Sequence, residues 1–258
     1  IINQLKRKGY AVQKNIIPKK LCTKLGEELD KISKSSKYKK YKFHLSKSQL
    51  QILNVNYIKP DIFMKYISNK KILNVLKEVF KEKFILSNFN ASKALKSNNY
   101  KCRLHIDSRM PITNFENTTH IIAHICIDNL TEKNGSTVIL KNSHKKKINS
   151  SNRKIIKLIA PKGSIIFFLG HLWHDIGNNL NGARRWAIIA YYCRWWIKPT
   201  FDFVRSCPKK TFILLNDCQK ELLGFNSTPP IDWSLRRRTL RNVKSIPKYF
   251  SKINKFLK

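Results

Sequence analysis

The stretch from Gly163 to Trp196 constrains the fold of this chain more than any other. Two short apolar runs, Ile165 to Leu169 and Trp186 to Tyr192, flank a polar segment rich in asparagine and glycine. Runs this short, bounded by such residues and rich in β-branched and aromatic side chains, favour strands over helices. We therefore expect a strand, a polar turn that carries His174, and a return strand that follows Arg184-Arg185.

A second feature lies far upstream, in Leu104-His105-Ile106-Asp107. In a strand, residues i and i+2 point to the same face, so His105 and Asp107 can offer an imidazole and a carboxylate to one point. A third ligand is needed, and His174, 69 residues further on (174 − 105), is the candidate. Two histidines and one carboxylate on one side of a metal suit non-haem Fe(II) oxygenases. A lone His-x-Asp is common by chance, and the alternative for His174 is a packed core residue.

A rival metal set lies on one strand-like segment, Thr118 to Ile127. His120, His124 and Cys126 would share one of its faces. A strand rises by about 3.3 Å per residue, whereas metal–ligand bonds are only about 2 Å long. We therefore expect these side chains to pack or to line the interior of a barrel rather than to bind one ion.

Several ordered features together resemble the phytanoyl-CoA dioxygenase family of Fe(II)/2-oxoglutarate oxygenases. They are LHID, TEKNGSTVILKNSH (131–144), GSIIFFLGHLWHDIGNN (163–179), and an arginine 11 residues after His174 (185 − 174). The resemblance implies that His105, Asp107 and His174 bind the metal and that Arg185 holds the far carboxylate of 2-oxoglutarate. Arginine suits this task because its planar fork binds a carboxylate through two hydrogen bonds.

The family spacing also decides between neighbours. It selects His174 over His171, and Arg185 over Arg184, which is then expected to face away, towards solvent. Thr137 is either a contact of 2-oxoglutarate or an ordinary strand threonine. His144 is expected to hold the loop after that strand.

The resemblance implies an oxidoreductase that uses Fe(II), 2-oxoglutarate and O2 to hydroxylate an unactivated C–H bond of a small organic molecule, releasing succinate and CO2. Related halogenating enzymes have a small residue where this chain has Asp107, which argues for hydroxylation. One alternative is a nucleic-acid-modifying dioxygenase, although that family usually carries a further arginine pair that Arg185 alone does not supply. Another is a non-catalytic module on the same fold that binds anions or nucleic acid.

Short strands with turn signals, and few strong helices after residue 84, predict a mainly β protein with flanking helices. The resemblance implies the same core, a cupin-like jelly roll or double-stranded β-helix. With 258 residues and 42% hydrophobic residues, we expect one domain. It divides into a helical part (1–83), the core (84–200) and a basic helical tail (201–258).

Periodicity and turn signals predict the main elements along the chain. They are a strand over 10–17, a helix over 18–33, a mobile loop over 34–46, two short helices over 61–80, a strand over 84–95, a hairpin-type turn at Asn134-Gly135, and a helix over 210–223.

The charge is unusual, with 52 Lys and Arg against 15 Asp and Glu, a formal net charge of +37. Such a charge attracts phosphates, nucleic acid or anionic membranes, and an anionic substrate would suit it. The lysines are spread along the chain, however, which favours a solvated surface over a nucleic-acid site.

Residues 234–258 hold nine basic residues and no acid. That segment either rests on an anionic surface or, as we favour, docks on its own domain.

The expected compartment is the cytoplasm. The six cysteines are scattered without a CxxC pair, which indicates a reducing environment. No apolar run approaches the roughly 20 residues needed to span a bilayer, and the first residues lack a signal-peptide core. The sequence gives no prediction of the oligomeric state.

Overall fold

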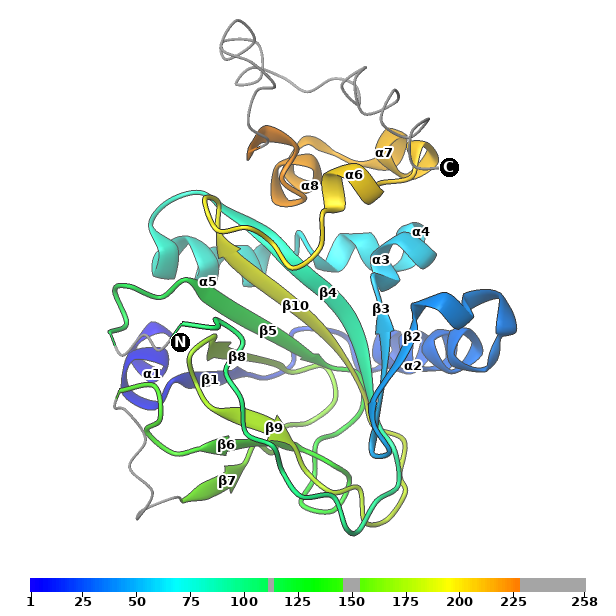
Figure 1. The fold of residues 1–258 in the computed structure, drawn as a ribbon, viewed down its shortest axis with the longest axis vertical. Coiled ribbons are helices and arrows are strands. Elements are labelled where there is room, and N and C mark those ends of the chain that lie inside the picture. The colour runs from blue at the N-terminus through cyan, green and yellow to red at the C-terminus, as the bar shows by residue number, and fades with distance from the viewer. Residues whose placement is uncertain (111–113, 146–153, 228–258) are drawn as a thin grey trace, which may run out of the picture.

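The computed structural model describes residues 1–110, 114–145 and 154–227 (Figure 1). Its centre is a seven-stranded sheet of order β1-β8-β5-β10-β4-β3-β2, accompanied by a three-stranded sheet of order β7-β6-β9. Neighbouring strands are antiparallel throughout both sheets. The strands are β1 Tyr10–Gln13, β2 Lys42–Ser46, β3 Gln49–Leu53, β4 Phe84–Ala94, β5 His120–Cys126, β6 Thr137–Leu140, β7 Ile155–Lys157, β8 Ile165–Leu169, β9 His174–Ile176 and β10 Trp186–Arg194.

Strand β5, near the middle of the larger sheet, is buried on both faces. All seven of its residues are buried, and they alternate between two cores, as successive strand residues must. Ile121, Ala123 and Ile125 pack into a large core with residues of the helices. Ile122 and Cys126 belong to a smaller core that also contains residues of the three-stranded sheet. This arrangement confirms the predicted antiparallel jelly roll with helices outside it.

The helices form where the sequence has apolar residues at helical spacing. α2 buries Cys22, Leu25, Leu29 and Ile32, and α5 begins where the Asn69 side chain accepts hydrogen bonds from two backbone amides. The α-helices are α1 Ile2–Lys8, α2 Lys19–Lys34, α3 Val55–Ile58, α4 Pro60–Phe63, α5 Lys70–Phe80, α6 Phe203–Ser206, α7 Lys209–Leu214 and α8 Asp217–Leu222. The 3-10 helices are η1 Ser36–Tyr41, η2 Met64–Tyr66 and η3 Phe225–Ser227. No helix in these described ranges is long and apolar enough to cross a membrane.

The segment 163–196 forms three strands and not the predicted strand and return strand. β8 and β10 both pair with β5, which lies between them, and β9 belongs to the smaller sheet. The turn at Asn134-Gly135 is likewise no hairpin, because β5 and β6 lie in different sheets. Local periodicity specifies an extended conformation but not the pairing partner.

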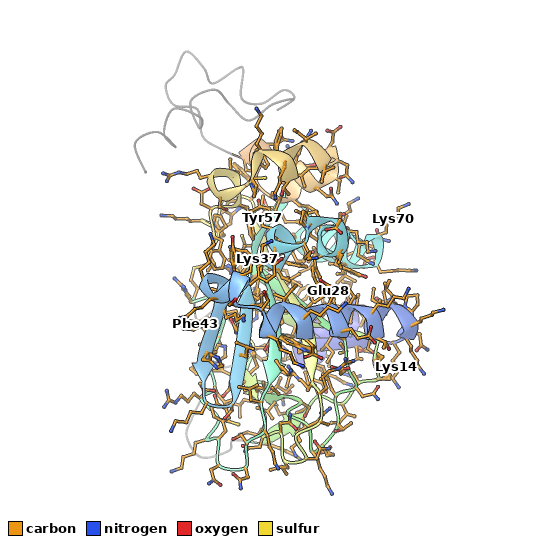
Figure 2. The ribbon with its side chains drawn as sticks, turned by 90° about the vertical axis from the view of Figure 1, so that its right-hand side faces the viewer. Lys14, Glu28, Lys37, Phe43, Tyr57 and Lys70 are labelled. Atoms are coloured by element: carbon orange, nitrogen blue, oxygen red, sulfur yellow. The ribbon has the colours of Figure 1, made fainter. Side chains whose placement is uncertain are left out.

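Three other expectations were wrong in detail. The expected loop over 34–46 is η1 followed by the edge strand β2, on which Figure 2 labels Phe43. The expected strand over 10–17 ends at Gln13. The expected helix over 210–223 is two helices, because Asn216 and Gln219 form a capping box that starts α8.

The expected helices over 18–33 and 61–80 and the strand over 84–95 are confirmed. The division at residues 84 and 201 stays a prediction, although β1, β2 and β3 join the same sheet as the later strands. The basic segment 234–258 lies outside the described residues.

Candidate metal centre and co-substrate pocket

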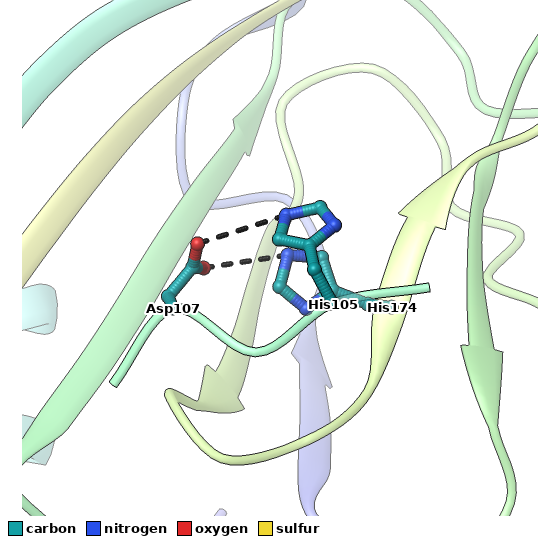
Figure 3. A group of neighbouring side chains, drawn as sticks. All are labelled: His105, Asp107 and His174. Atoms are coloured by element: carbon teal, nitrogen blue, oxygen red, sulfur yellow. Dashed lines mark ion pairs between the residues drawn. The ribbon is translucent and has the colours of Figure 1, made fainter. Parts of the chain in front are cut away.

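His105, Asp107 and His174 lie together in the structure (Figure 3). One ligand atom from each lies within 4.8 Å of the others. The Nε2 atom of His105 is 3.8 Å from Asp107 Oδ1, and that of His174 is 3.3 Å from Asp107 Oδ2. Among the described residues no other three His, Cys, Asp or Glu side chains form such a group, so His120, His124 and Cys126 do not.

Backbone hydrogen bonds fix this arrangement. Residues 104–107 do not form a regular strand, but His105 makes one antiparallel bridge with His174. Each amide donates to the other's carbonyl, at 3.1 and 3.0 Å. The amide of Asp107 donates to the carbonyl of Gly170 at 2.8 Å. The turn between β8 and β9 therefore positions all three side chains.

Backbone carbonyls also orient the two imidazoles. Nδ1 of His174 lies 2.9 Å from the oxygen of Leu172, and Nδ1 of His105 lies 3.3 Å from the oxygen of Arg103. Because a carbonyl only accepts, each Nδ1 carries a proton, and each ring turns its Nε2 towards Asp107.

This donor set fits a bound divalent cation. Two imidazole lone pairs and a carboxylate repel one another unless a proton or a metal ion lies between them. Oδ2 of Asp107 is buried and has no close polar neighbour except Nε2 of His174, at 3.3 Å, so a bound cation would give this oxygen a ligand role. Nitrogen and oxygen donors of this kind suit Fe(II) and similar metals.

The pKa values respond to the same pairing when no metal is present. Burial alone would raise the pKa of Asp107, but the adjacent His174 and His105 hold it below its usual value. Burial would lower the pKa of His174, and the carboxylate of Asp107 raises it above its usual value.

A pocket of about 460 Å³, a volume that includes open solvent, adjoins the three side chains. Arg185 lies in its wall and is only 2% exposed. Its Nη2 donates to Thr137 Oγ1 at 3.2 Å, and no carboxylate of the described residues pairs with it. Burial lowers the pKa of Arg185 to about 10, so the guanidinium remains a cation at neutral pH.

Arg184 points the other way, as expected, but not to solvent. Its Nε and Nη2 both bond to Asp128, the closest contact being 2.9 Å, and its Nη1 lies 3.5 Å from Asp30. Asp128 also accepts from the amide of Trp186. Arg184 thus holds α2 and the start of β10 together and leaves Arg185 to the pocket.

The other candidates have structural surroundings. His171 is buried in the turn after β8 and does not join the three side chains. Asp175 accepts hydrogen bonds from the Tyr100 hydroxyl at 2.8 Å and the Arg103 amide at 2.6 Å. His144 lies 3.2 Å from the carbonyl of Lys6 and so ties its loop to α1.

Sequence reasoning missed the opposite wall of the pocket. Gln49 and Gln51 of β3, Ser92 of β4 and Tyr191 of β10 line it. Gln51 lies directly opposite Ser92 in the β3–β4 ladder, which puts both side chains on the inner face. The alternation of glutamine with apolar residues in QLQIL could have indicated a strand with a polar inner face. The residue that pairs with Gln51, however, lies 41 residues further on (92 − 51).

Known proteins resemble this chain in sequence. A family model described as phytanoyl-CoA dioxygenase (PhyH) matches residues 5–187. A protein of Aspergillus fumigatus named Dioxygenase af480 is 24% identical over 165 residues, which cover 61% of this chain and 53% of that protein. An uncharacterized protein of Mycobacterium tuberculosis is 28% identical over 105 residues, 39% of this chain and 38% of that protein. The chain thus spans about half, or less, of the length of these curated relatives.

Solved structures share the fold at low identity. HygX from Streptomyces hygroscopicus, solved with nickel and 2-oxoglutarate bound, matches with a TM-score of 0.63 and 11% identity over 77% of this chain and 87% of HygX. SnoN, a non-heme alpha ketoglutarate dependent epimerase from nogalamycin biosynthesis, matches with a TM-score of 0.60 and 11% identity over 74% of this chain and 81% of SnoN.

Proposed function

The chain belongs to the phytanoyl-CoA dioxygenase family, and from that premise we propose that it is an Fe(II)- and 2-oxoglutarate-dependent dioxygenase. The observation that carries the proposal is the convergence of His105, Asp107 and His174 beside a pocket that holds a buried, carboxylate-free arginine. A metal centre alone would fit many reactions. The unpaired cation next to it matches the need to hold a dicarboxylate co-substrate.

The proposed ligands of Fe(II) are His105, Asp107 and His174. When bound, the metal with 2-oxoglutarate and O2 supplies an oxidant for an unactivated C–H bond, and succinate and CO2 are released. The residues of the chain fix the ligand geometry through the backbone bridge between His105 and His174. Arg185 binds the far carboxylate of 2-oxoglutarate, with Thr137 beside it.

The proposed substrate is a small molecule that approaches past His105, whose side chain is 48% exposed. Gln51, Leu45 and Tyr191 are among the residues that line the pocket. No lysine of the described residues lines it, so the high positive charge of the chain gives no reason to expect an anionic substrate there. HygX has been solved with hygromycin B bound, which is consistent with a small-molecule substrate on this fold.

The test is anaerobic addition of Fe(II) and 2-oxoglutarate to the purified protein. The wild type is expected to develop the weak visible charge-transfer band of 2-oxoglutarate chelated to Fe(II). His174→Ala is expected to lose it. A wild type without the band, or a band that persists in His174→Ala, contradicts the proposal. A screen for succinate release over small metabolites then searches for the substrate.

A further inference from the structure

His124 is a buried histidine that lines the same pocket. It lies on β5, opposite Ile189 of β10 and Ile166 of β8, and its side chain is 2% exposed. Its Nε2 atom is buried and has no hydrogen-bond partner. A buried polar atom without a partner is rare because it loses its bonds to water and gains none.

The neighbours of His124 allow a tautomer in which the proton of the ring lies on Nε2. Arg185 has only donors, so its Nη2 must donate to Thr137 Oγ1, at 3.2 Å. The hydroxyl of Thr137 is then free to donate its own proton to Nδ1 of His124, at 3.4 Å. When Thr137 donates in this way, Nδ1 is the acceptor of the ring, and the proton of the neutral imidazole is on Nε2.

In that tautomer two buried N–H donors lack acceptors in one pocket. They are Nε2 of His124 and Nε of Arg185. The described residues put no carboxylate in an ion pair with Arg185. An anion with two oxygens would accept from both donors and neutralise the guanidinium.

We propose that His124 is a second binding residue for the far carboxylate of 2-oxoglutarate, to which its Nε2–H donates beside the Arg185 guanidinium. The inference rests on the proposed function, since it concerns the same co-substrate. It makes Thr137 the link that sets the tautomer of His124, with its hydroxyl between the two donors.

The charges around the ring agree with a neutral donor. Burial, the Arg185 cation just before β10 and His174 on β9 together hold the pKa of His124 well below its usual value. The ring thus adds a hydrogen bond without adding charge. One guanidinium then faces one carboxylate, which leaves no net charge buried at this end of the pocket.

Ligand affinity tests the inference without turnover. The protein is loaded with Ni(II), which does not start the reaction, and calorimetry measures the Kd of 2-oxoglutarate and of 2-oxopentanoate. The second ligand keeps the metal-chelating end and has a methyl group in place of the far carboxylate. Wild type is expected to prefer 2-oxoglutarate. His124→Phe is expected to weaken 2-oxoglutarate about tenfold, the worth of one hydrogen bond to a charged group, and to leave 2-oxopentanoate within about twofold.

Matched variants separate this role from a structural one. His171→Phe changes another buried histidine that lies outside the pocket, and both affinities should stay at the wild-type values. His124→Gln keeps an N–H donor and should retain most of the preference. If His124→Phe does not fold, His124→Met replaces it, since methionine adapts to irregular space.

The possible failures are distinguishable. If wild type binds 2-oxoglutarate and His124→Phe weakens both ligands equally or neither, the inference about His124 is overturned and the proposed function stands. If the Ni(II)-loaded wild type binds neither ligand, the proposed function fails, and this inference with it.

Discussion

His105 and His174 are oriented by the same local device. In each, Nδ1 meets the carbonyl oxygen of the residue two positions earlier, Arg103 for one and Leu172 for the other. Each ring therefore presents Nε2 to Asp107, with or without a metal ion bound between the three side chains. A metal-binding histidine is commonly held in this way, and the hydrogen bond also makes the ligand more basic.

Asp107→Asn is expected to weaken Ni(II) binding by at least about 100-fold, because the ligand set loses its only negative charge. Calorimetry with the metal alone measures the effect. Asp202→Asn changes a half-exposed carboxylate far along the chain and should bind Ni(II) as wild type does. Equal affinity in the Asp107 and Asp202 variants would argue against a metal centre at this position.

Arg184 and Arg185 are adjacent but have separable roles. Arg185→Met should remove most of the preference of the Ni(II)-loaded protein for 2-oxoglutarate over 2-oxopentanoate, since no other arginine or lysine of the described residues lines the pocket. Arg184→Met should keep that preference and lose about 1 kcal/mol of unfolding free energy, because its ion pairs are partly exposed. Calorimetry and urea unfolding measure the two effects, and exchanged phenotypes would refute the assignment.

At the scale of elements, α2 is tied to the sheet by Asp30. Its Oδ1 accepts from Lys93 of β4 and from the indole of Trp186 of β10, both at 2.8 Å. Although burial raises the pKa of Asp30, these hydrogen bonds and the charges of Lys93 and Arg184 hold it below the usual value.

A depressed pKa in the folded state makes the carboxylate stabilising above the pKa of about 3.9 that it has when unfolded. That stabilisation is lost as the pH falls through the folded-state pKa. Asp30→Asn is therefore expected to lower the unfolding free energy at pH 7, with the gap to wild type narrowing towards pH 3. Urea unfolding at both pH values measures the gap, and a gap that is constant with pH would contradict this role.

Gly163 shows how a turn anchors β1 and β8. Its φ is +84°, and a Cβ there would lie 2.1 Å from the carbonyl oxygen of Ile17. Gly163→Ala should cost at least about 2–3 kcal/mol of unfolding free energy. The backbone at Ile17 must move to make room for the new Cβ, and the alanine must adopt an unfavourable positive φ. Gly224 has a φ of +90° but its nearest neighbour would be at 3.8 Å. Gly224→Ala should therefore cost only about 1 kcal/mol, and equal costs in urea unfolding would refute the steric argument.

Local sequence patterns predicted helices and strands well where the identity of the pairing strand did not matter. α2, α5, β4 and β5 follow from their own apolar spacing. The pairing of β3 with β4, and hence the place of Gln51 in the pocket, depends on contacts between distant segments. Residues 42–46 form an edge strand with an exposed outer side, so their composition resembles that of a loop.

At the scale of the whole molecule, the family motifs predicted the candidate site better than spacing alone did. His-x-Asp was a weak signal until a histidine and an arginine at the family offsets accompanied it. His124 was expected only to pack or to line a barrel, because its unpaired Nε2 and its link to Arg185 through Thr137 exist only in the folded chain.

The net charge of +37 acts on the molecule as a whole. Lys14, Lys37 and Lys70 are exposed in separate parts of one face (Figure 2), so the charge there is spread. Such charges repel one another in the compact state, and salt screens them. The melting temperature should therefore rise by several degrees between about 0.02 and 0.3 M NaCl. A melting temperature that falls with salt would indicate that ion pairs dominate.

Anomalous X-ray scattering from a crystal of the protein grown with Ni(II) and 2-oxoglutarate tests the central claim most directly. The account predicts one strong nickel peak between Nε2 of His105, Nε2 of His174 and the carboxylate of Asp107, with the far carboxylate of 2-oxoglutarate on Arg185. A nickel peak elsewhere, or none at these three side chains at saturating Ni(II), would contradict it.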